Sequence, residues 1–230
     1  MEIRPLQEGH VSVRKYLYLA ACVAASAAVV ALPATSAFAA GHVLTIKKTG
    51  GTAVKRGDVL KASLVTGTSA VFSLGTQKLT CKAAKFSAKV KSNPVKPGTA
   101  TESLTAQSFS KCKTNVMGIT VKSIKVKNLP YNVTVSDGSG FPVKVSGQSK
   151  TKPILLTVTV TFSGSPITCS YKAASVKGAA SNKGNKISFS KQKFTKSAGG
   201  TLCPASANFA AAFGPVVDSS VTGSPKVFVN

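Results

Sequence analysis

Alternation of apolar and polar residues with a period of two is the feature that most constrains the fold of this chain. Leu156 to Phe162 alternate apolar side chains with Thr, and Lys85 to Lys91 alternate Phe, Ala and Val with Lys and Ser. This period is typical of β-strands with one buried face. Beyond residue 39 no long segment has the period of a helix, although Ala205 to Ala212 fits either a short helix or a strand. We therefore expect an all-β protein.

Turn sequences separate these runs and predict antiparallel pairing. Ser136 to Gly140 joins two alternating segments, 131–135 and 141–145, and is a strong hairpin signal. Further loops follow at 92–98 and 147–153, and the second of these is a possible linker. Many short strands at this spacing are typical of an antiparallel β-sandwich. We expect either two similar sandwich units, 40–148 and 149–230, or one pseudo-symmetric sandwich.

The first 39 residues have the organisation of a secretory signal peptide. Arg14 and Lys15 precede an apolar run, 16–32, and a small-x-small cleavage site ends at Ala39. The apolar run is at the short edge for a membrane span. Two alternatives stay open: Cys22 lies in a lipoprotein-type box and would then carry a lipid, and Val13 is an alternative start. The sequence predicts a secreted, extracellular protein, and association with the cell wall is a further expectation.

Cleavage after residue 39 leaves an even number of cysteines, which in an exported protein predicts two disulfides. The four are Cys81, Cys112, Cys169 and Cys203, and three pairings are possible in principle. An internal repeat selects among them, because residues 79–81 match 167–169 and residues 107–111 match 192–196. Coincidence in a chain rich in Lys, Ser and Thr is the rival explanation. If the repeat is real, Cys81 pairs with Cys112 and Cys169 with Cys203.

A strong positive charge is the one positive indication of function. The chain has 30 Lys and Arg against 6 Asp and Glu, for a formal net charge of +24. Such a field attracts anionic partners, and nearly all the basic residues are Lys, which favours diffuse attraction over shaped recognition. A solvated surface that keeps the protein soluble is the simpler interpretation. The candidate anion-binding residues lie on the outward side of predicted strands: Lys85, Lys89, Lys91, Lys122, Lys125, Lys127 and Lys144.

The residues needed for common catalytic and metal chemistry are scarce. The only His after residue 39 is His42, which we expect in a solvated tail, so a base for Ser or Cys catalysis is missing. The four acids after residue 39, at 58, 102, 137 and 218, show no spacing of a glycosidase pair or a calcium site. Trp is absent, and most Phe fit core positions. We expect no enzyme activity, no metal and no cofactor.

Several segments resemble a group of secreted, β-rich actinobacterial proteins without an established activity. They include Gly50 to Val54, Gly57 to Leu60, Pro97 to Thr105, Asn128 to Tyr131, and Phe194 to Lys196 before Cys203. The resemblance covers nearly the whole chain after residue 39. It implies export, β-structure and two disulfides, and it supplies no catalytic residues. The high Lys content departs from the group and indicates a specialised surface.

These observations predict a secreted, non-enzymatic binding protein that is retained on anionic polymers of the cell envelope or its surroundings. Teichoic-type polymers, acidic polysaccharide and extracellular DNA fit this description. One alternative is an adaptor or structural subunit of a secreted assembly, for which residues 41–48 offer a strand to a partner's sheet, although pairing within the same fold is the expected state. A second alternative is an inhibitor of a secreted hydrolase.

Overall fold

The structure, a computed structural model, describes residues 41–230. The expected signal peptide, with Cys22 and the cleavage site, lies outside these residues. The described chain consists of sixteen β-strands joined by turns and loops, and no helix occurs in it. The all-β prediction is therefore confirmed. In residues 41–230 there is no helix with the length and hydropathy that crossing a membrane requires.

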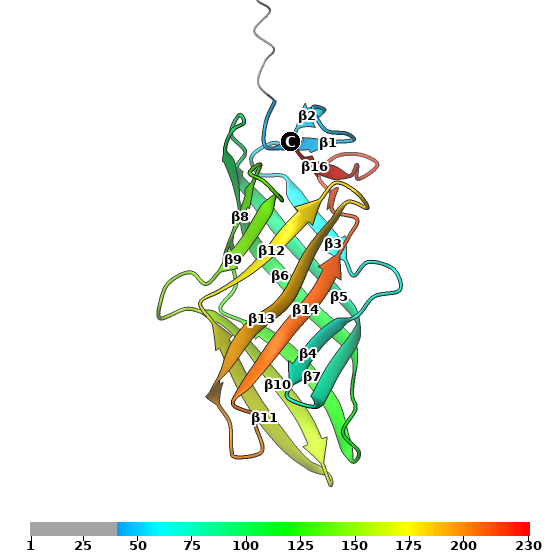
Figure 1. The fold of residues 1–230 in the computed structure, drawn as a ribbon, viewed down its shortest axis with the longest axis vertical. Helices are drawn as coiled ribbons and strands as arrows, with labels where there is room; N and C mark the ends of the chain where they lie inside the picture. The colour runs from blue at the N-terminus through cyan, green and yellow to red at the C-terminus, as the bar shows by residue number, and fades with distance from the viewer. Residues whose placement is uncertain (1–40) are drawn as a thin grey trace, which may run out of the picture. The chain divides into compact units, whose positions relative to one another are not determined.

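Most of the strands form one large sheet that closes on itself (Figure 1). Closure occurs because β12 pairs with β9 on one side and with β13 on the other. The predicted sandwich is wrong at this level of detail, since the sheet forms a closed barrel of eight strands. Closure satisfies the edges that a sandwich leaves unpaired. In order around the ring the strands are β12 (Ser175–Ser181), β9 (Pro142–Ser146), β8 (Tyr131–Ser136), β6 (Thr99–Thr114), β5 (Gln77–Ser92), β4 (Ala70–Leu74), β14 (Ser206–Phe213) and β13 (Lys186–Ala198).

The long strands change partners along their length, so the sheet branches. β13 pairs with β12 through Lys186–Phe189 and with β11 (Ser165–Ala173) near Thr195. Beyond β11 lie β10 (Ile154–Phe162) and β7 (Ile119–Lys127). β5 likewise pairs with β4 through its first residues and with β3 (Val59–Ser63) further along. On its other side β3 pairs with β15 (Val217–Asp218).

Strands from both halves of the sequence pair with each other. The expected unit boundary at 148 falls between β9 and β10, yet β4 pairs with β14 and β9 pairs with β12 across it. Residues 41–230 belong to one compact unit. The two expected units therefore share one sheet and do not have separate ones.

Both disulfides have the pairing that the repeat predicts. Cys81 on β5 and Cys112 on β6 lie directly opposite each other and are bonded. Cys169 on β11 is bonded to Cys203, which lies in the loop between β13 and β14. The matched segments occupy equivalent places, because β11 pairs with β13 as β5 pairs with β6. The repeat is thus a repeat of strand pairing, although β12 (Ser175–Ser181) lies between β11 and β13 in the sequence and β6 follows β5 directly.

The N-terminal segment pairs within its own fold. A small sheet holds β1 (Leu44–Ile46) between β16 (Val227–Val229) and β2 (Thr52–Ala53). The segment considered as a strand for a partner therefore has neighbours on both sides. His42 is half-buried and forms a bridge with Val95, so its expected place in a solvated tail is wrong.

The core is built from Phe and β-branched side chains on the inward positions of the strands. Phe72 packs on Phe109 and Phe209, with ring centroids 5.4 and 5.0 Å apart. Phe209 belongs to β14, a strand paired on both sides, so the helix considered for residues 205–212 does not form. Most Phe therefore serve packing, as the alternating pattern predicts.

Candidate polyanion-binding surface

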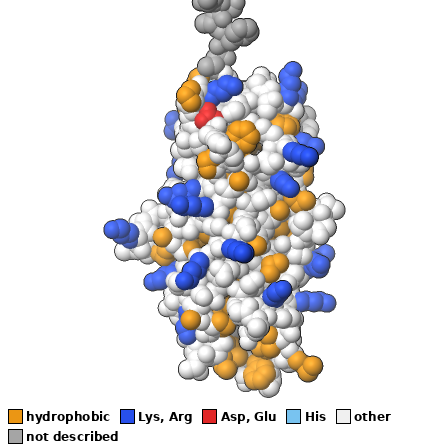
Figure 2. Space-filling model, in the orientation of Figure 1, with side chains coloured by type: hydrophobic (Ala, Val, Ile, Leu, Met, Phe, Trp, Pro, Cys, Tyr) orange, Lys and Arg blue, Asp and Glu red, His pale blue; other side chains and the backbone are white. Residues whose placement is uncertain are grey.

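All seven Lys singled out from the sequence are exposed on the outside of their strands. They lie on three strands, with Lys85, Lys89 and Lys91 on β5, three more on β7, and Lys144 on β9. These strands do not pair with one another, so the structure does not bring the seven into one patch. Lys and Arg side chains are scattered over the face shown in Figure 2, whereas hydrophobic side chains gather at its lower end.

One part of the β5 surface does bring Lys residues together. Lys61 on β3 lies directly opposite Ser87, which places it diagonally between Lys85 and Lys89. Diagonal neighbours across an antiparallel pair lie about 7–8 Å apart. The sequence analysis did not single out Lys61. The signal that identifies it is the alternation in β3, where Leu60 and Ala62 are buried and Lys61 is exposed.

A hollow of about 590 Å³ lies beside these residues on the outer face of β3, β5 and β6. The hollow is present because small side chains, mainly Ser and Ala, face each other across the strands that form its floor. Ser63 lies opposite Lys85, which lies opposite Ser108, and Ser87 lies opposite Ala106. Gly214 and Pro215 border the hollow beyond β3. We call this feature the lysine groove; it combines Lys61 and Lys85 with serine hydroxyls, and Lys89 lies next along β5.

The four carboxylates of the described residues are either hydrogen-bonded to the backbone or buried. Asp137 accepts hydrogen bonds from the Gly98 amide at 3.1 and 3.0 Å, and Asp58 accepts one from the Lys55 amide at 2.7 Å. Glu102 and Asp218 are buried. In residues 41–230 no carboxylate side chain is fully exposed. The positive field of the outer Lys residues is therefore little offset at the surface.

Two of these carboxylates are neighbours, which the sequence did not predict. Burial raises the pKa of Asp218, and the nearby Asp58 raises it further, although a hydrogen bond from the Ser220 amide opposes the shift. The surrounding bonds fasten β15 to β3, because the Val59 amide donates to Ser220 Oγ at 2.8 Å and the Ser219 amide donates to the Val59 carbonyl. The pair thus lies at a structural junction.

Glu102 is the other perturbed acid. It points into the barrel, where it lines a small interior hollow of about 30 Å³ together with Asn185. Burial raises the pKa of Glu102 to about 7. Among the described residues no group of three or more His, Cys, Asp or Glu is placed to hold a metal ion. Because its pKa is raised in the folded protein, Glu102 makes the free energy of unfolding depend on pH.

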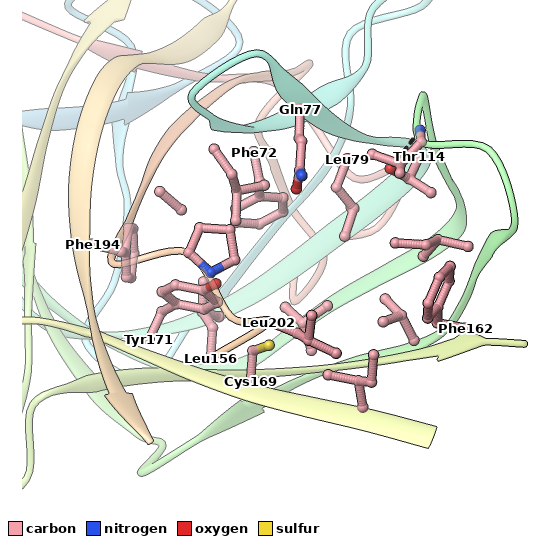
Figure 3. Close-up of a pocket in the computed structure, with 18 residues that line it drawn as sticks. Phe72, Gln77, Leu79, Thr114, Leu156, Phe162, Cys169, Tyr171, Phe194 and Leu202 are labelled. Atoms are coloured by element: carbon pink, nitrogen blue, oxygen red, sulfur yellow. Dashed lines mark hydrogen bonds between the residues drawn. The ribbon is translucent and has the colours of Figure 1, made fainter. Parts of the chain in front are cut away.

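A second concave feature lies at the other end of the strands. It is an apolar cavity of about 270 Å³ between β10 and β11 on one side and β4, β5 and β14 on the other (Figure 3). Gln77, Thr114 and Tyr171 are the main polar side chains among its lining residues. The alternation of β10 predicts that Leu156, Val158 and Val160 face inward, but it does not predict an open space in front of them. We call this feature the apolar cavity.

Comparison with known proteins found no match for this chain among family models, curated proteins or solved structures.

Proposed function

We propose that this protein is a secreted, non-enzymatic binding protein that is retained on anionic polymers through its Lys-rich outer surface, with the lysine groove as the principal contact. The observation that carries the proposal is the placement of Lys61 between Lys85 and Lys89 beside a hollow floored by small residues. Of the four carboxylates, which would weaken such a site, Glu102 and Asp218 are buried and Asp137 accepts hydrogen bonds from the Gly98 amide, whereas the half-buried Asp58 lies beside Val90 of β5.

The residue types favour a polymer over a small anion. Lys is a compact, hydrated charge that attracts phosphate or carboxylate without fixing its orientation, whereas Arg provides the bidentate contacts of shaped recognition. Lys85, Lys89 and Lys91 follow one another along the outer face of β5, with about 13 Å from Lys85 to Lys89 and about 7 Å from Lys89 to Lys91. A row of charges on a rigid strand suits a repeating chain such as a teichoic-type polymer, an acidic polysaccharide or extracellular DNA.

The location outside the cell rests on the two disulfides. Such bonds form and persist in oxidising compartments and are rare in the cytosol. Both are present in the described residues. A polymer exposed at a cell surface or shed into the medium then becomes the accessible partner.

Retention on polymer-coated beads tests the proposal. The protein from residue 40 is applied to beads carrying teichoic acid, acidic polysaccharide, DNA or neutral dextran, over a series of salt concentrations. Counterion release predicts a steep loss of binding to the anionic beads as salt rises, and no binding to dextran. A flat response to salt on every bead would contradict the electrostatic basis.

A triple variant locates the contact. Lys61→Gln/Lys85→Gln/Lys89→Gln should lower the slope of log affinity against log salt on DNA by about three, since each phosphate contact contributes close to one. The matched control is Lys150→Gln/Lys152→Gln/Lys183→Gln, which removes the same charge from exposed loop residues. Equal losses in the two variants would show that the whole surface binds and would remove the lysine groove as the site.

A further inference from the structure

The apolar cavity has the properties of a ligand site that is separate from the lysine groove. Protein interiors are close-packed, and voids larger than a water molecule are few. The Phe cluster beside the cavity is packed in that manner, with Phe194 and Phe209 in edge-to-face contact. The cavity itself leaves about 270 Å³ empty within a wall of apolar side chains. A space of that size is close to the smaller ligand pockets of proteins.

The rim of the cavity exposes large apolar side chains. Leu202 is 68% exposed and Phe162 is 44% exposed, and both line the cavity. Phe162 lies toward one end of the cavity, and Tyr171 and Phe194 lie toward the other (Figure 3). Apolar residues at the entrance of an apolar cavity mark a place where a ligand leaves water.

A buried hydroxyl without a partner indicates what the ligand must offer. Tyr171 is 3% exposed, and its hydroxyl has no hydrogen-bond partner among the described residues. Buried polar groups in proteins are nearly always hydrogen-bonded. Tyr131 provides the contrast within this molecule: its hydroxyl accepts a bond from the Leu155 amide at 3.0 Å and donates to the Lys127 carbonyl. Tyr171 lacks such neighbours and lines the apolar cavity instead.

The residues that line the apolar cavity favour an uncharged ligand. Among the described residues, none that lines the apolar cavity is Lys, Arg, His, Asp or Glu, so a charged group inside it would be buried without a counter-ion. The size follows from the volume, because an apolar cavity of about 150 Å³ accommodates benzene. A cavity of about 270 Å³ therefore suits a molecule of roughly ten non-hydrogen atoms.

We propose that the apolar cavity binds a small, neutral, mostly apolar molecule of about ten non-hydrogen atoms that carries one hydrogen-bonding oxygen, and that the Tyr171 hydroxyl bonds this oxygen. Aromatic alcohols and medium-chain alcohols or ketones belong to this class. The ligand enters past Phe162 and Leu202. The site is independent of anionic polymers, and its test does not depend on the lysine groove.

Four probe molecules test the proposal: 2-naphthol, naphthalene, octan-1-ol and octanoate. Binding is measured by isothermal titration and by the change in Tyr fluorescence at pH 8. We expect 2-naphthol to bind about three- to tenfold more tightly than naphthalene, the range given by one net hydrogen bond. Octan-1-ol should bind, and octanoate, which is charged, should not. Failure of both neutral alcohols to bind would overturn the proposal, as would tighter binding of octanoate.

Two variants connect the binding to the cavity. Tyr171→Phe removes only the hydroxyl, so it should abolish the preference for 2-naphthol while leaving naphthalene affinity unchanged. It should not lower the thermal stability of the free protein, because the lost hydroxyl has no partner to leave behind. Val158→Phe, at a half-buried lining position, should fill the space and abolish binding of every probe. An unchanged preference in Tyr171→Phe, or unchanged binding in a folded Val158→Phe, would refute the site.

Discussion

Lys144 on β9 and Lys177 on β12 lie directly opposite each other across one of the two pairings that close the barrel. Both side chains are exposed on the outer face. Like charges at directly opposed positions destabilise a pair of strands. The closure of the barrel therefore carries a local electrostatic penalty.

Reversing one of these charges should stabilise the protein. Lys177→Glu converts the repulsive pair into an attractive one, and we expect the free energy of unfolding to rise by about 0.5–1 kcal/mol at low salt. Urea unfolding at two salt concentrations measures the change, which should shrink as salt screens the charges. Lys150→Glu, in an exposed loop, is the matched control for net charge. An equal gain in the control would assign the effect to net charge alone.

Stability should fall as the pH rises from about 5 to 7, because of Glu102. Its pKa is about 7 in the folded protein and near 4.5 when exposed. Between these values the folded state retains a proton that the unfolded state releases, so the free energy of unfolding decreases with rising pH, by about 3 kcal/mol over the window. Glu102→Gln should remove this decrease. Urea unfolding from pH 4 to 8 provides the measurement; parallel curves for the two proteins would contradict the assignment.

The two disulfides should differ in their effect on the apolar cavity. They close loops of similar length, with separations of 31 and 34 residues, so losing either should cost about 3–4 kcal/mol of unfolding free energy. Only Cys169–Cys203 fastens the loop that carries Leu202 and Pro204 to the cavity wall. Cys169→Ala/Cys203→Ala should therefore weaken 2-naphthol binding more than Cys81→Ala/Cys112→Ala. Equal affinities in the two folded variants would exclude that loop as part of the site.

Gly199 should not tolerate a side chain. Its φ is +119°, and a Cβ atom there would lie 2.5 Å from Cys203 Sγ and 2.9 Å from the Thr168 carbonyl oxygen. Gly199→Ala should lower the free energy of unfolding by about 1–3 kcal/mol and slow formation of the adjacent disulfide. Gly200→Ala is the control, since a Cβ atom there meets nothing within 4 Å. Chemical denaturation of both variants, with a thiol assay, makes the comparison.

The sequence predicts the individual strands of this protein better than the closure of the sheet into a barrel. Alternation identifies β10 and the outward Lys residues of β5, because both follow from side chains alternating across a strand. The fate of Ser206–Phe213 depends on neighbours instead, since it is a strand only because β13 and β4 flank it. A sandwich and a closed barrel share the same alternation, and the choice between them rests on whether β12 finds a second partner.

The candidate sites were only partly predictable for a related reason. Lys85 and Lys89 are outward by pattern alone, but Lys61 joins them because β3 pairs with β5 in a particular register. The apolar cavity gives no sequence signal, since Leu156 and Val158 look the same whether the space before them is filled or empty. In the sequence Tyr171 has the pattern of an ordinary core residue, and only the structure shows that its hydroxyl has no hydrogen-bond partner among the described residues.

The exchange of partners along β13 has a dynamic consequence. Its first residues complete the eight-stranded ring through β12, and its later residues hold β11 near the apolar cavity. Because the same strand pairs with both β12 and β11, fraying of β13 at one of these pairings weakens the other pairing. Occupancy of the cavity should thus slow amide hydrogen exchange at Lys186–Phe189, which do not line the cavity, by making the shared strand open less often.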